Sequence, residues 1–280
     1  MKTDPWPDPP DLETDEIHVW WARVGAAEGV GAPVGAAHGP DPRGPGGGAP
    51  ADEGAWLNPD EEARAARFHF ERHRTRYVAR QRFLRWLLGR YTGEAPERLA
   101  FGSGRHGKPF LIPAPGPASG AATGSGGATT GELTFNLSHS EHWILVGVSR
   151  GRELGVDVEV HRLRTELDRM AQAVFTPREC TTLDGVERDL RLDAFFRGWT
   201  RKEAALKATG EGFAREPRTL EIGLGPRRAG ECWDAPDDAV LVGYELADLD
   251  APEGVGAAVC ATAPPWRPRV VTPWRDAVIV

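Results

Sequence analysis

Cysteine is scarce in this sequence and long apolar runs are absent, and both features exclude classes of protein. Its three cysteines, Cys180, Cys232 and Cys260, lie far apart and are odd in number, so neither a disulfide framework nor a cysteine metal cluster is expected. No apolar run is long enough to cross a bilayer. The N-terminal stretch MKTDPWPDPPDLETDE is acidic and proline-rich, unlike a signal peptide. We therefore expect a cytoplasmic globular protein with no membrane partner.

An excess of basic residues, typical of proteins that bind nucleic acid, is also missing. The chain has 34 Lys and Arg against 41 Asp and Glu, a formal net charge of −7, which argues against a dedicated nucleic-acid binder. Hydrophobic residues make up 40% of the 280 residues, enough to bury a core in one large domain or two of modest size.

Strand and helix patterns fall into two groups along the chain. The first has a strand over 17–24, helices from Asn58 (a predicted N-cap before Pro59) to about 93, and the strands LTFNLS and WILVGVS. The second has the strand LGVDVEV, helices over 165–175, 177–184 and 187–209, and strands over 218–224, 239–246 and 255–261. The polar turn RGRE between WILVGVS and LGVDVEV predicts a β-hairpin. These patterns predict an α+β fold with two halves of similar build.

The expected domain boundaries follow from these groups and from composition. We expect a disordered or extended tail over 1–16, an N-terminal α/β subdomain over 17–153, a C-terminal α/β subdomain over 154–262, and a C-terminal extension over 263–280. Two Gly/Pro-rich stretches, 25–55 and 112–132, are predicted to be flexible loops inside the first subdomain.

The strand LGVDVEV alternates apolar and acidic residues. Its period of two places the leucine and valines on one face and Asp157 and Glu159 on the other. The two carboxylates would be about 6–7 Å apart and would repel each other by roughly 2–3 kcal/mol at an effective dielectric constant of about 20. The acidic face is therefore either solvated or neutralised by a cation.

The segment WTRKEAALKATGEG carries a second candidate constellation. Thr200 and Glu203 match a capping box, which predicts that a helix begins at Thr200. Glu203 and Lys207 are four residues apart in the favourable order for a helix ion pair, so a purely structural role explains this segment as well as a functional one. The functional alternative is an acid and a lysine that hold a metal and a phosphate near a helix N-terminus.

Three further patterns are weaker. GSGRHG matches a dinucleotide fingerprint, but Lys108 and Pro109 follow at once and prevent the required helix, so a turn presenting Lys108 is expected. Ser138 and His139 are chain neighbours, which does not make a hydrolase geometry, and they are either a polar strand end or an anion contact. Most arginines between 64 and 85 are expected on the outer face of an amphipathic helix, with one or two reaching into a site.

GVDVE followed by WTRKEAALK resembles the signature of phosphopantetheinyl transferases, roughly G-[VI]-D-[VI]-E and then W-[ST]-x-K-E-[AS]-x-x-K. GRHGKPFL, FNLSHS and NPDEEARAARF resemble further segments of that family. The resemblance covers about 57–260, and the order of segments is similar to the larger, pseudo-dimeric subfamily that modifies carrier proteins of peptide and polyketide synthesis.

The resemblance implies a pseudo-dimeric fold with the active site in the cleft between two α/β subdomains. It implies a monomeric enzyme of secondary-metabolite biosynthesis that moves the phosphopantetheine arm of coenzyme A to a serine of an apo carrier protein. Mg²⁺ would be held by Asp157, Glu159 and Glu203. Contacts to coenzyme A would come from Arg64, Arg74, Lys108, Ser138, His139, Lys202 and Lys207.

The resemblance also assigns chemical roles. Asp157, Glu203 and Lys207 would carry catalysis, with Lys207 at the pyrophosphate, while His139 would contact the 3'-phosphate. The base that takes the serine proton is either Glu203 or a metal-bound water, and we favour Glu203. A non-catalytic module that binds coenzyme A or a carrier protein is the alternative, and a metal-dependent phosphate-ester hydrolase is another. The complete set of three acids disfavours the non-catalytic module.

Overall fold

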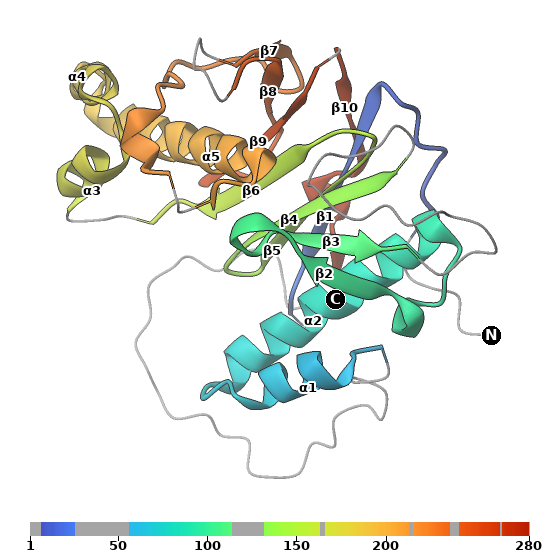
Figure 1. The fold of residues 1–280 in the computed structure, drawn as a ribbon. Coiled ribbons are helices and arrows are strands. Elements are labelled where there is room, and N and C mark those ends of the chain that lie inside the picture. The colour runs from blue at the N-terminus through green and yellow to red at the C-terminus, as the bar shows by residue number, and fades with distance from the viewer. Residues whose placement is uncertain are drawn as a thin grey trace.

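The computed structural model describes residues 7–25, 56–113, 132–162, 166–212, 215–235, 241–263 and 265–279. Most of the two predicted flexible loops, and residues 1–6 of the predicted tail, lie outside this part of the chain. The fold is α+β, as predicted: two sheets face each other, and a long helix covers the outer face of each (Figure 1). None of the helices in the described ranges is both long and apolar enough to span a membrane.

The first sheet is built around β1 (Glu16–Arg23), which confirms the first predicted strand. β4 (Leu133–Ser140) and β5 (Trp143–Arg150) form an antiparallel hairpin, and β5 also pairs with β1. The helix α2 (Glu71–Thr92) packs Phe83 and Leu87 against Trp20 and Val146 of this sheet. This packing explains the apolar positions within an otherwise arginine-rich helix.

A shorter helix, α1 (Pro59–Ala66), precedes α2 and begins as the sequence predicts. The side chain of Asn58 accepts a hydrogen bond from the Glu61 backbone N–H at 2.9 Å, and the Glu61 carboxylate accepts one from the Asn58 N–H at 2.9 Å. Glu61 also binds Arg85 of α2 at 2.8 Å, and Arg85 is fully buried. Arg85 therefore joins two helices and is an exception to the expectation that most of these arginines lie on the outer face.

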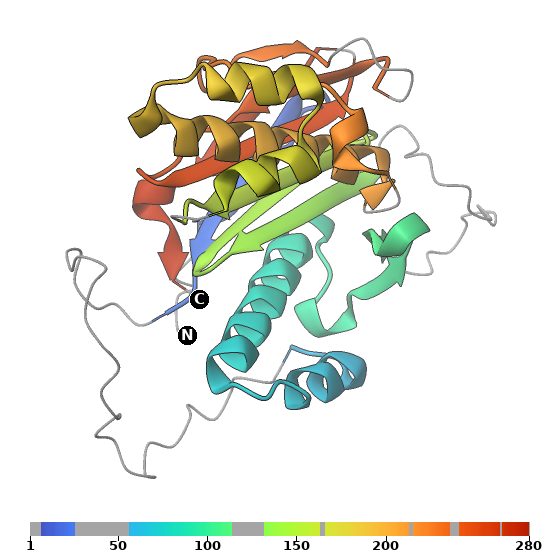
Figure 2. The same cartoon turned by 90° about the vertical axis from the view of Figure 1, so that its left-hand side faces the viewer.

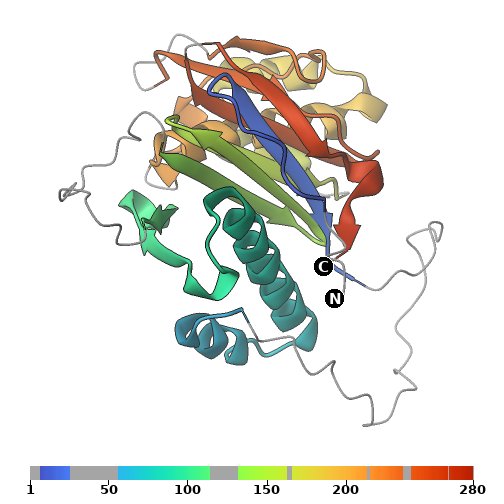
Figure 3. The same cartoon turned by 90° about the vertical axis from the view of Figure 1, so that its right-hand side faces the viewer.

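The C-terminal segment completes the first sheet. β10 (Arg267–Thr272) and β11 (Val278–Ile279) both run parallel to β1, and the strand order is β10-β1-β5-β4. Figure 3 shows blue β1 with the red C-terminal strand on one side and the light-green strands on the other. Buried Glu16 on β1 accepts hydrogen bonds from Arg267 at 2.9 Å and Arg269 at 3.2 Å. The segment predicted as an extension thus belongs to the first half.

The second sheet has the order β6-β9-β8-β7 and is antiparallel throughout. Its strands are β6 (Leu154–Val160), β7 (Cys232–Asp234), β8 (Tyr244–Asp248) and β9 (Val255–Thr262). Its helices are α3 (Leu167–Val174), α4 (Pro177–Asp184) and α5 (Arg191–Thr209), close to the predicted ranges. Figure 2 shows these three helices gathered on the side of the molecule opposite α2.

Two strand predictions are wrong. RGRE does not close a hairpin, because β5 pairs with β4 and β6 pairs with β9, so the chain crosses from one sheet to the other there. Residues 218–224 form no strand. A 3₁₀ turn (Pro217–Thr219) begins this segment, and the N–H groups of Ile222 and Gly223 bind the Glu179 carboxylate instead of a neighbouring strand.

A third, small sheet is the hairpin of β2 (Ala100–Ser103) and β3 (Pro109–Ile112). A 3₁₀ turn over 105–107 joins the strands, with His106 at φ 53°. GSGRHG is therefore a hairpin turn with no helix after it, as the interpretation of Lys108 and Pro109 predicts.

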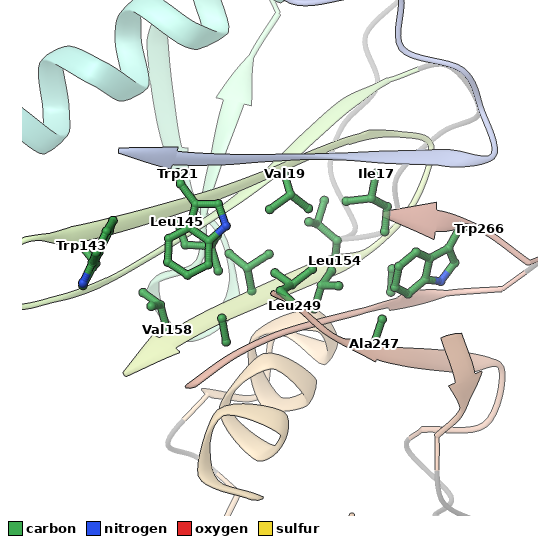
Figure 4. Close-up of a cluster of buried hydrophobic side chains, with 14 residues drawn as sticks. Ile17, Val19, Trp21, Trp143, Leu145, Leu154, Val158, Ala247, Leu249 and Trp266 are labelled. Atoms are coloured by element: carbon green, nitrogen blue, oxygen red, sulfur yellow. The ribbon is translucent and has the colours of Figure 1, made fainter. Parts of the chain in front are cut away.

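Apolar side chains fill the space between the two large sheets (Figure 4). Val19 and Trp21 of β1 face Val156 and Val158 of β6, and all four are fully buried. This confirms the prediction that the apolar face of LGVDVEV packs into the core. Its acidic face must then point the other way, toward α5.

Strand β6 and helix α5 lie very close together at Gly155. A Cβ atom there would lie 2.2 Å from the backbone oxygen of Ala204 and 2.4 Å from the backbone nitrogen of Ala208. Backbone atoms cannot rotate away as a side chain can, so only glycine fits without moving the strand or the helix. This contact sets how near the residues that follow on β6 come to α5.

We expect Gly155→Ala to lower the free energy of unfolding by about 2–4 kcal/mol, at or above the upper end of ordinary overpacking, because the clash is with backbone. Urea unfolding followed by tryptophan fluorescence measures the change. Gly185→Ala is the control, since its Cβ would meet nothing nearer than 3.5 Å and its φ is −81°. Equal urea midpoints for the two variants would contradict this account of the contact.

Candidate active site

The edges of the two sheets meet along a seam between β4 and β6. The backbones do not pair there. Instead, alternate side chains of β4 accept hydrogen bonds from alternate backbone N–H groups of β6. The three bonds join Val156 N–H to Asn136 Oδ1 at 2.9 Å, Val158 N–H to Ser138 Oγ at 3.4 Å and Val160 N–H to Ser140 Oγ at 3.1 Å. Both strands repeat every two residues, so a single register brings all three pairs together.

The same seam holds two carboxylates. Ser138 Oγ donates to Asp157 Oδ1 at 2.8 Å, and Ser140 Oγ donates to Glu159 Oε2 at 2.8 Å. Each serine hydroxyl therefore accepts a hydrogen bond from one residue of β6 and donates one to the preceding residue. Asp157 is buried and Glu159 is partly exposed, so the pair runs from the interior toward solvent.

Helix α5 brings a third carboxylate and a cation to this place. Lys207 Nζ binds Asp157 Oδ1 at 2.6 Å and also donates to Ser138 Oγ at 3.0 Å and to the Val156 carbonyl at 3.2 Å. Glu203, one turn earlier, is buried and close enough to both acids of β6 for their charges to affect it. Lys207 thus pairs with the strand, and no Glu203–Lys207 ion pair forms among the described residues.

The predicted helix start at Thr200 is wrong. Helix α5 begins at Arg191, and the Thr200 hydroxyl donates to the Arg197 carbonyl at 3.1 Å inside the helix. Glu203 therefore lies in the interior of α5, where the positive potential of a helix N-terminus has faded. Lys207 supplies positive charge at this place. The suggested binding of a phosphate by a helix N-terminus at Thr200 is therefore wrong.

Burial raises the pKa of all three acids, and repulsion between carboxylates adds to the rise at Glu159 and Glu203. Desolvation raises the pKa of Glu203 to about 7, and the charges of Asp157 and Glu159 add to the rise, while Lys207 opposes it. Desolvation also raises the pKa of Asp157, opposed by Lys207, and that of Glu159, where Asp157 adds to the rise and Ser140 and Trp199 oppose it. One lysine offsets only part of the repulsion.

Two oxygens at this place lack a hydrogen-bond donor. Asp157 Oδ2 and Glu203 Oε1 are buried without a partner, which is costly for carboxylate oxygens. Over the described ranges, no three Asp, Glu, His or Cys side chains converge closely enough to hold a metal ion as they stand. The unpartnered oxygens and the all-carboxylate donor set nevertheless fit a hard divalent cation such as Mg²⁺.

Lys108 and His139 lie near this group. Lys108 Nζ donates to the Ala208 carbonyl at 3.1 Å, at the end of α5 next to Lys207, and pairs with Glu153 at 3.0 Å. The pKa of His139 is lowered to about 4, by desolvation first and then by Arg80, Lys207 and Arg76. Because the His139 side chain is exposed, we attribute the lowered pKa mainly to its positively charged neighbours. His139 therefore lies among cations.

The arginines near His139 identify which part of the arginine-rich segment faces the site. Arg80 and Arg64 lie over the Tyr77 ring, at 5.3 Å and 5.5 Å from its centroid. Arg80 is partly buried, and desolvation lowers its pKa to about 10. The family resemblance implies Arg64 for the site, whereas Arg76 and Arg80 are predicted only as members of the arginine-rich segment. Arg76 and Arg80 lie on α2 with Tyr77, and their spacing from Tyr77 along this helix is a signal that could have found them.

Two predicted contacts to coenzyme A lie elsewhere. Arg74 is exposed and pairs with Glu71 at 2.9 Å on the outer side of α2. Lys202 is fully buried, pairs with Glu179 at 2.6 Å and donates to the carbonyls of Pro217 and Leu220. All three N–H bonds of Lys202 are therefore used inside the protein. The prediction for Lys202 is corrected to a structural role, holding segment 217–223 against α4 and α5.

Comparisons with known proteins agree with this constellation. A family model described as the 4'-phosphopantetheinyl transferase superfamily matches residues 153–240. The chain is 33% identical over 265 residues to the 4'-phosphopantetheinyl transferase HetI of Nostoc sp. (strain PCC 7120), covering 94% of this chain and 95% of that protein. The 4'-phosphopantetheinyl transferase of Bacillus subtilis is 24% identical, over 75% of this chain and 84% of its own length.

The raised pKa of Glu203 predicts how stability depends on pH without metal. Between about pH 4.5 and 7 the folded state keeps a proton on Glu203 that the unfolded chain loses, so the free energy of unfolding falls as pH rises. Glu203→Gln lacks this ionisation. The difference in free energy of unfolding between Glu203→Gln and wild type should therefore shift by roughly 2–4 kcal/mol in favour of the variant from pH 5 to pH 8.

Urea unfolding in EDTA at several pH values measures this difference. Glu216→Gln, which removes an exposed carboxylate paired with Arg218, is the control and should follow the wild-type profile. Parallel profiles for Glu203→Gln and wild type would show that folding does not raise the pKa of Glu203.

Proposed function

We propose, because the chain belongs to the 4'-phosphopantetheinyl transferase superfamily, that it moves the phosphopantetheine arm of coenzyme A onto a serine of an apo carrier protein. The carrier serine oxygen bonds to the β-phosphorus of coenzyme A, and the bond from that phosphorus to the bridging oxygen breaks. Adenosine 3',5'-bisphosphate leaves with the electron pair. The serine proton passes to a base.

The observation that carries this proposal is the joining of acids and a lysine from two elements. Asp157 and Glu159 on β6, and Glu203 and Lys207 on α5, meet beside the seam with β4. Phosphoryl transfer depends mainly on positioning and on neutralising phosphate charge, so a site for it needs fixed cations and a way to hold a metal. This constellation offers one fixed cation, Lys207, and carboxylates with two unpartnered oxygens that a metal can use.

The metal would be Mg²⁺, held by Asp157, Glu159 and Glu203. When bound, it would neutralise the pyrophosphate charge and orient the group being transferred. Asp157 Oδ2 and Glu203 Oε1 have no other partner and are available for it. Lys207 pairs with Asp157 in this structure, and its ammonium group would also bind the pyrophosphate of coenzyme A.

Basic residues beside the carboxylates would hold the nucleotide end of coenzyme A. Lys108, His139 and Arg64 retain the roles that the family resemblance implies, with Arg76 and Arg80 adding charge around His139. The Ser138 hydroxyl is engaged with Asp157 and Lys207, so its part is to hold those two groups. Lys202 has no place in this arrangement, because its N–H groups are used inside the protein, and Arg74 stays a prediction from the resemblance.

Glu203 is the base that the electrostatics favour. Without metal, the pKa of Glu203 is raised to about 7, which makes it a stronger proton acceptor than an ordinary glutamate. One carboxylate has two oxygens, so Glu203 can hold the metal with Oε1, which has no hydrogen-bond partner, and receive the serine proton with the other oxygen.

Each of these groups comes from one chain, so we propose that the working unit is a monomer. A cytoplasmic location remains the expectation for an enzyme whose partners are coenzyme A and a carrier protein.

Intact-mass spectrometry of a purified apo carrier protein, incubated with coenzyme A, Mg²⁺ and this protein, tests the activity. The carrier is expected to gain one phosphopantetheine. Asp157→Asn should slow the transfer by about 100-fold or more, since it removes one proposed metal charge while keeping the side-chain size.

Asp250→Asn is the matched control, because Asp250 is exposed and pairs with Arg275 at 2.8 Å far along the chain from the site residues. Its rate should equal the wild-type rate. If peptidyl and acyl carriers both stay unmodified by the wild-type protein, the transferase proposal is wrong. If Asp157→Asn transfers at the wild-type rate with the same Mg²⁺ dependence, the site assignment is wrong.

A further inference from the structure

Ser140 at the end of β4 makes two hydrogen bonds that neither the family resemblance nor the proposed reaction explains. Its Oγ donates to Glu159 Oε2 at 2.8 Å and accepts from the Val160 backbone N–H at 3.1 Å. One hydroxyl thus fixes both the strand and the carboxylate that the strand carries. Because it has a single proton, this pattern also fixes the direction of the bond toward Glu159.

Glu159 is the acid of the group that most needs such a partner. It is partly exposed, whereas Asp157 and Glu203 are buried, and it lies at the open end of the site. A glutamate side chain that is left free must lose up to about 2 kcal/mol of rotamer entropy when it binds a metal. Hydrogen bonds from Ser140 and Trp199, which favour its ionised form, hold it in advance.

The serine reaches Glu159 from the other sheet. Residues 153–240, which match the family model, contain all three acids and Trp199 but not β4. Ser140 belongs to the β4–β5 hairpin of the first sheet and meets β6 only across the seam. Asp157 and Glu159 are therefore held in part by hydroxyls that the first sheet supplies across the seam.

Ser138 makes the matching bond to Asp157 but is less informative. Its hydroxyl also accepts from Lys207 at 3.0 Å, so removing it would disturb the lysine as well as the acid. Ser140 binds only Glu159 and Val160 among the side chains and backbone groups of the described residues. A change at Ser140 therefore tests the hold on one acid.

We propose that Ser140 is a positioning residue that orients Glu159 for the divalent metal, and so sets the metal affinity of the site. The inference rests on the proposed function, in which Glu159 is a metal ligand. Partners that orient metal ligands commonly contribute about 10–100-fold to metal affinity. Ser140 should do the same without touching coenzyme A or the carrier.

The test is a titration of the full-length protein with Mn²⁺, in saturating coenzyme A without carrier, with free Mn²⁺ measured by electron paramagnetic resonance. Mn²⁺ prefers the same oxygen ligands as Mg²⁺. Ser140→Ala should raise the Mn²⁺ dissociation constant about 10-fold or more. Ser140→Thr keeps the hydroxyl and should stay within about 2-fold of wild type.

Ser149→Ala is the control for loss of a strand hydroxyl. Ser149 is fully buried at the other end of the same hairpin, and its hydroxyl lies 2.6 Å from Thr134. Its variant should lose some thermal stability, as Ser140→Ala does, while its Mn²⁺ affinity stays at the wild-type value. A merely structural role for Ser140 would change the two variants alike.

A wild-type Mn²⁺ affinity in Ser140→Ala would overturn the positioning role of Ser140. If Ser140→Ala does not fold, Ser140→Cys replaces it, because a thiol of similar size is only a weak donor, and the same loss of affinity is expected. Failure of the wild-type protein to bind Mn²⁺ and to modify a carrier would instead refute the proposed function.

Discussion

The burial of three neighbouring carboxylates is the constraint on which the rest of the site depends. Asp157 and Glu159 alternate along β6, and Glu203 faces them from α5. Burial raises the pKa of each acid, repulsion adds to the rise at Glu159 and Glu203, and Lys207 and the two serine hydroxyls of β4 offset only part of it. The folded protein therefore holds a deficit of positive charge at this place, and a divalent cation is the simplest species that removes it.

The position of β6 between two neighbours makes this concentration of charge possible. Its backbone pairs with β9 on one side, its other edge receives side chains from β4, and its valines close the core beneath the site. Gly155 then lets α5 approach until backbone atoms almost touch. A closer helix brings Glu203 and Lys207 nearer to the acids, so tight packing at a glycine has an electrostatic consequence.

Local patterns predicted the elements well and their partners poorly. Strand alternation over 154–160 and the cap at Asn58 depend on neighbouring residues, and both appear in the structure as expected. The prediction of a hairpin at RGRE was wrong because β6 pairs with β9, a strand far along the chain that no local pattern identifies. The prediction of a helix start at Thr200 was wrong because Thr-x-x-Glu can also occur inside a helix. Here α5 begins earlier, and its preceding turns are stabilised by the buried side chains of Phe195 and Phe196.

The candidate site shows the same division. The three acids and Lys207 were found because they lie in two short motifs, whereas Lys202, in the same motif, serves Glu179 instead of a ligand. That difference depends on which face of α5 meets α4, and a motif does not contain it. Contacts between helices and sheets decide what each charged residue of the motif does.

Ser140 and Glu159 are 19 residues apart, and a two-residue period on each strand still relates them. In FNLSHS the polar residues 136, 138 and 140 share one face, and in LGVDVEV the backbone groups that they bind recur at 156, 158 and 160. Once one of these pairs is known, the strand period predicts the others. An alternating polar strand beside an alternating acidic strand is therefore a readable signal, because the polar side chains are spaced to replace a missing backbone partner.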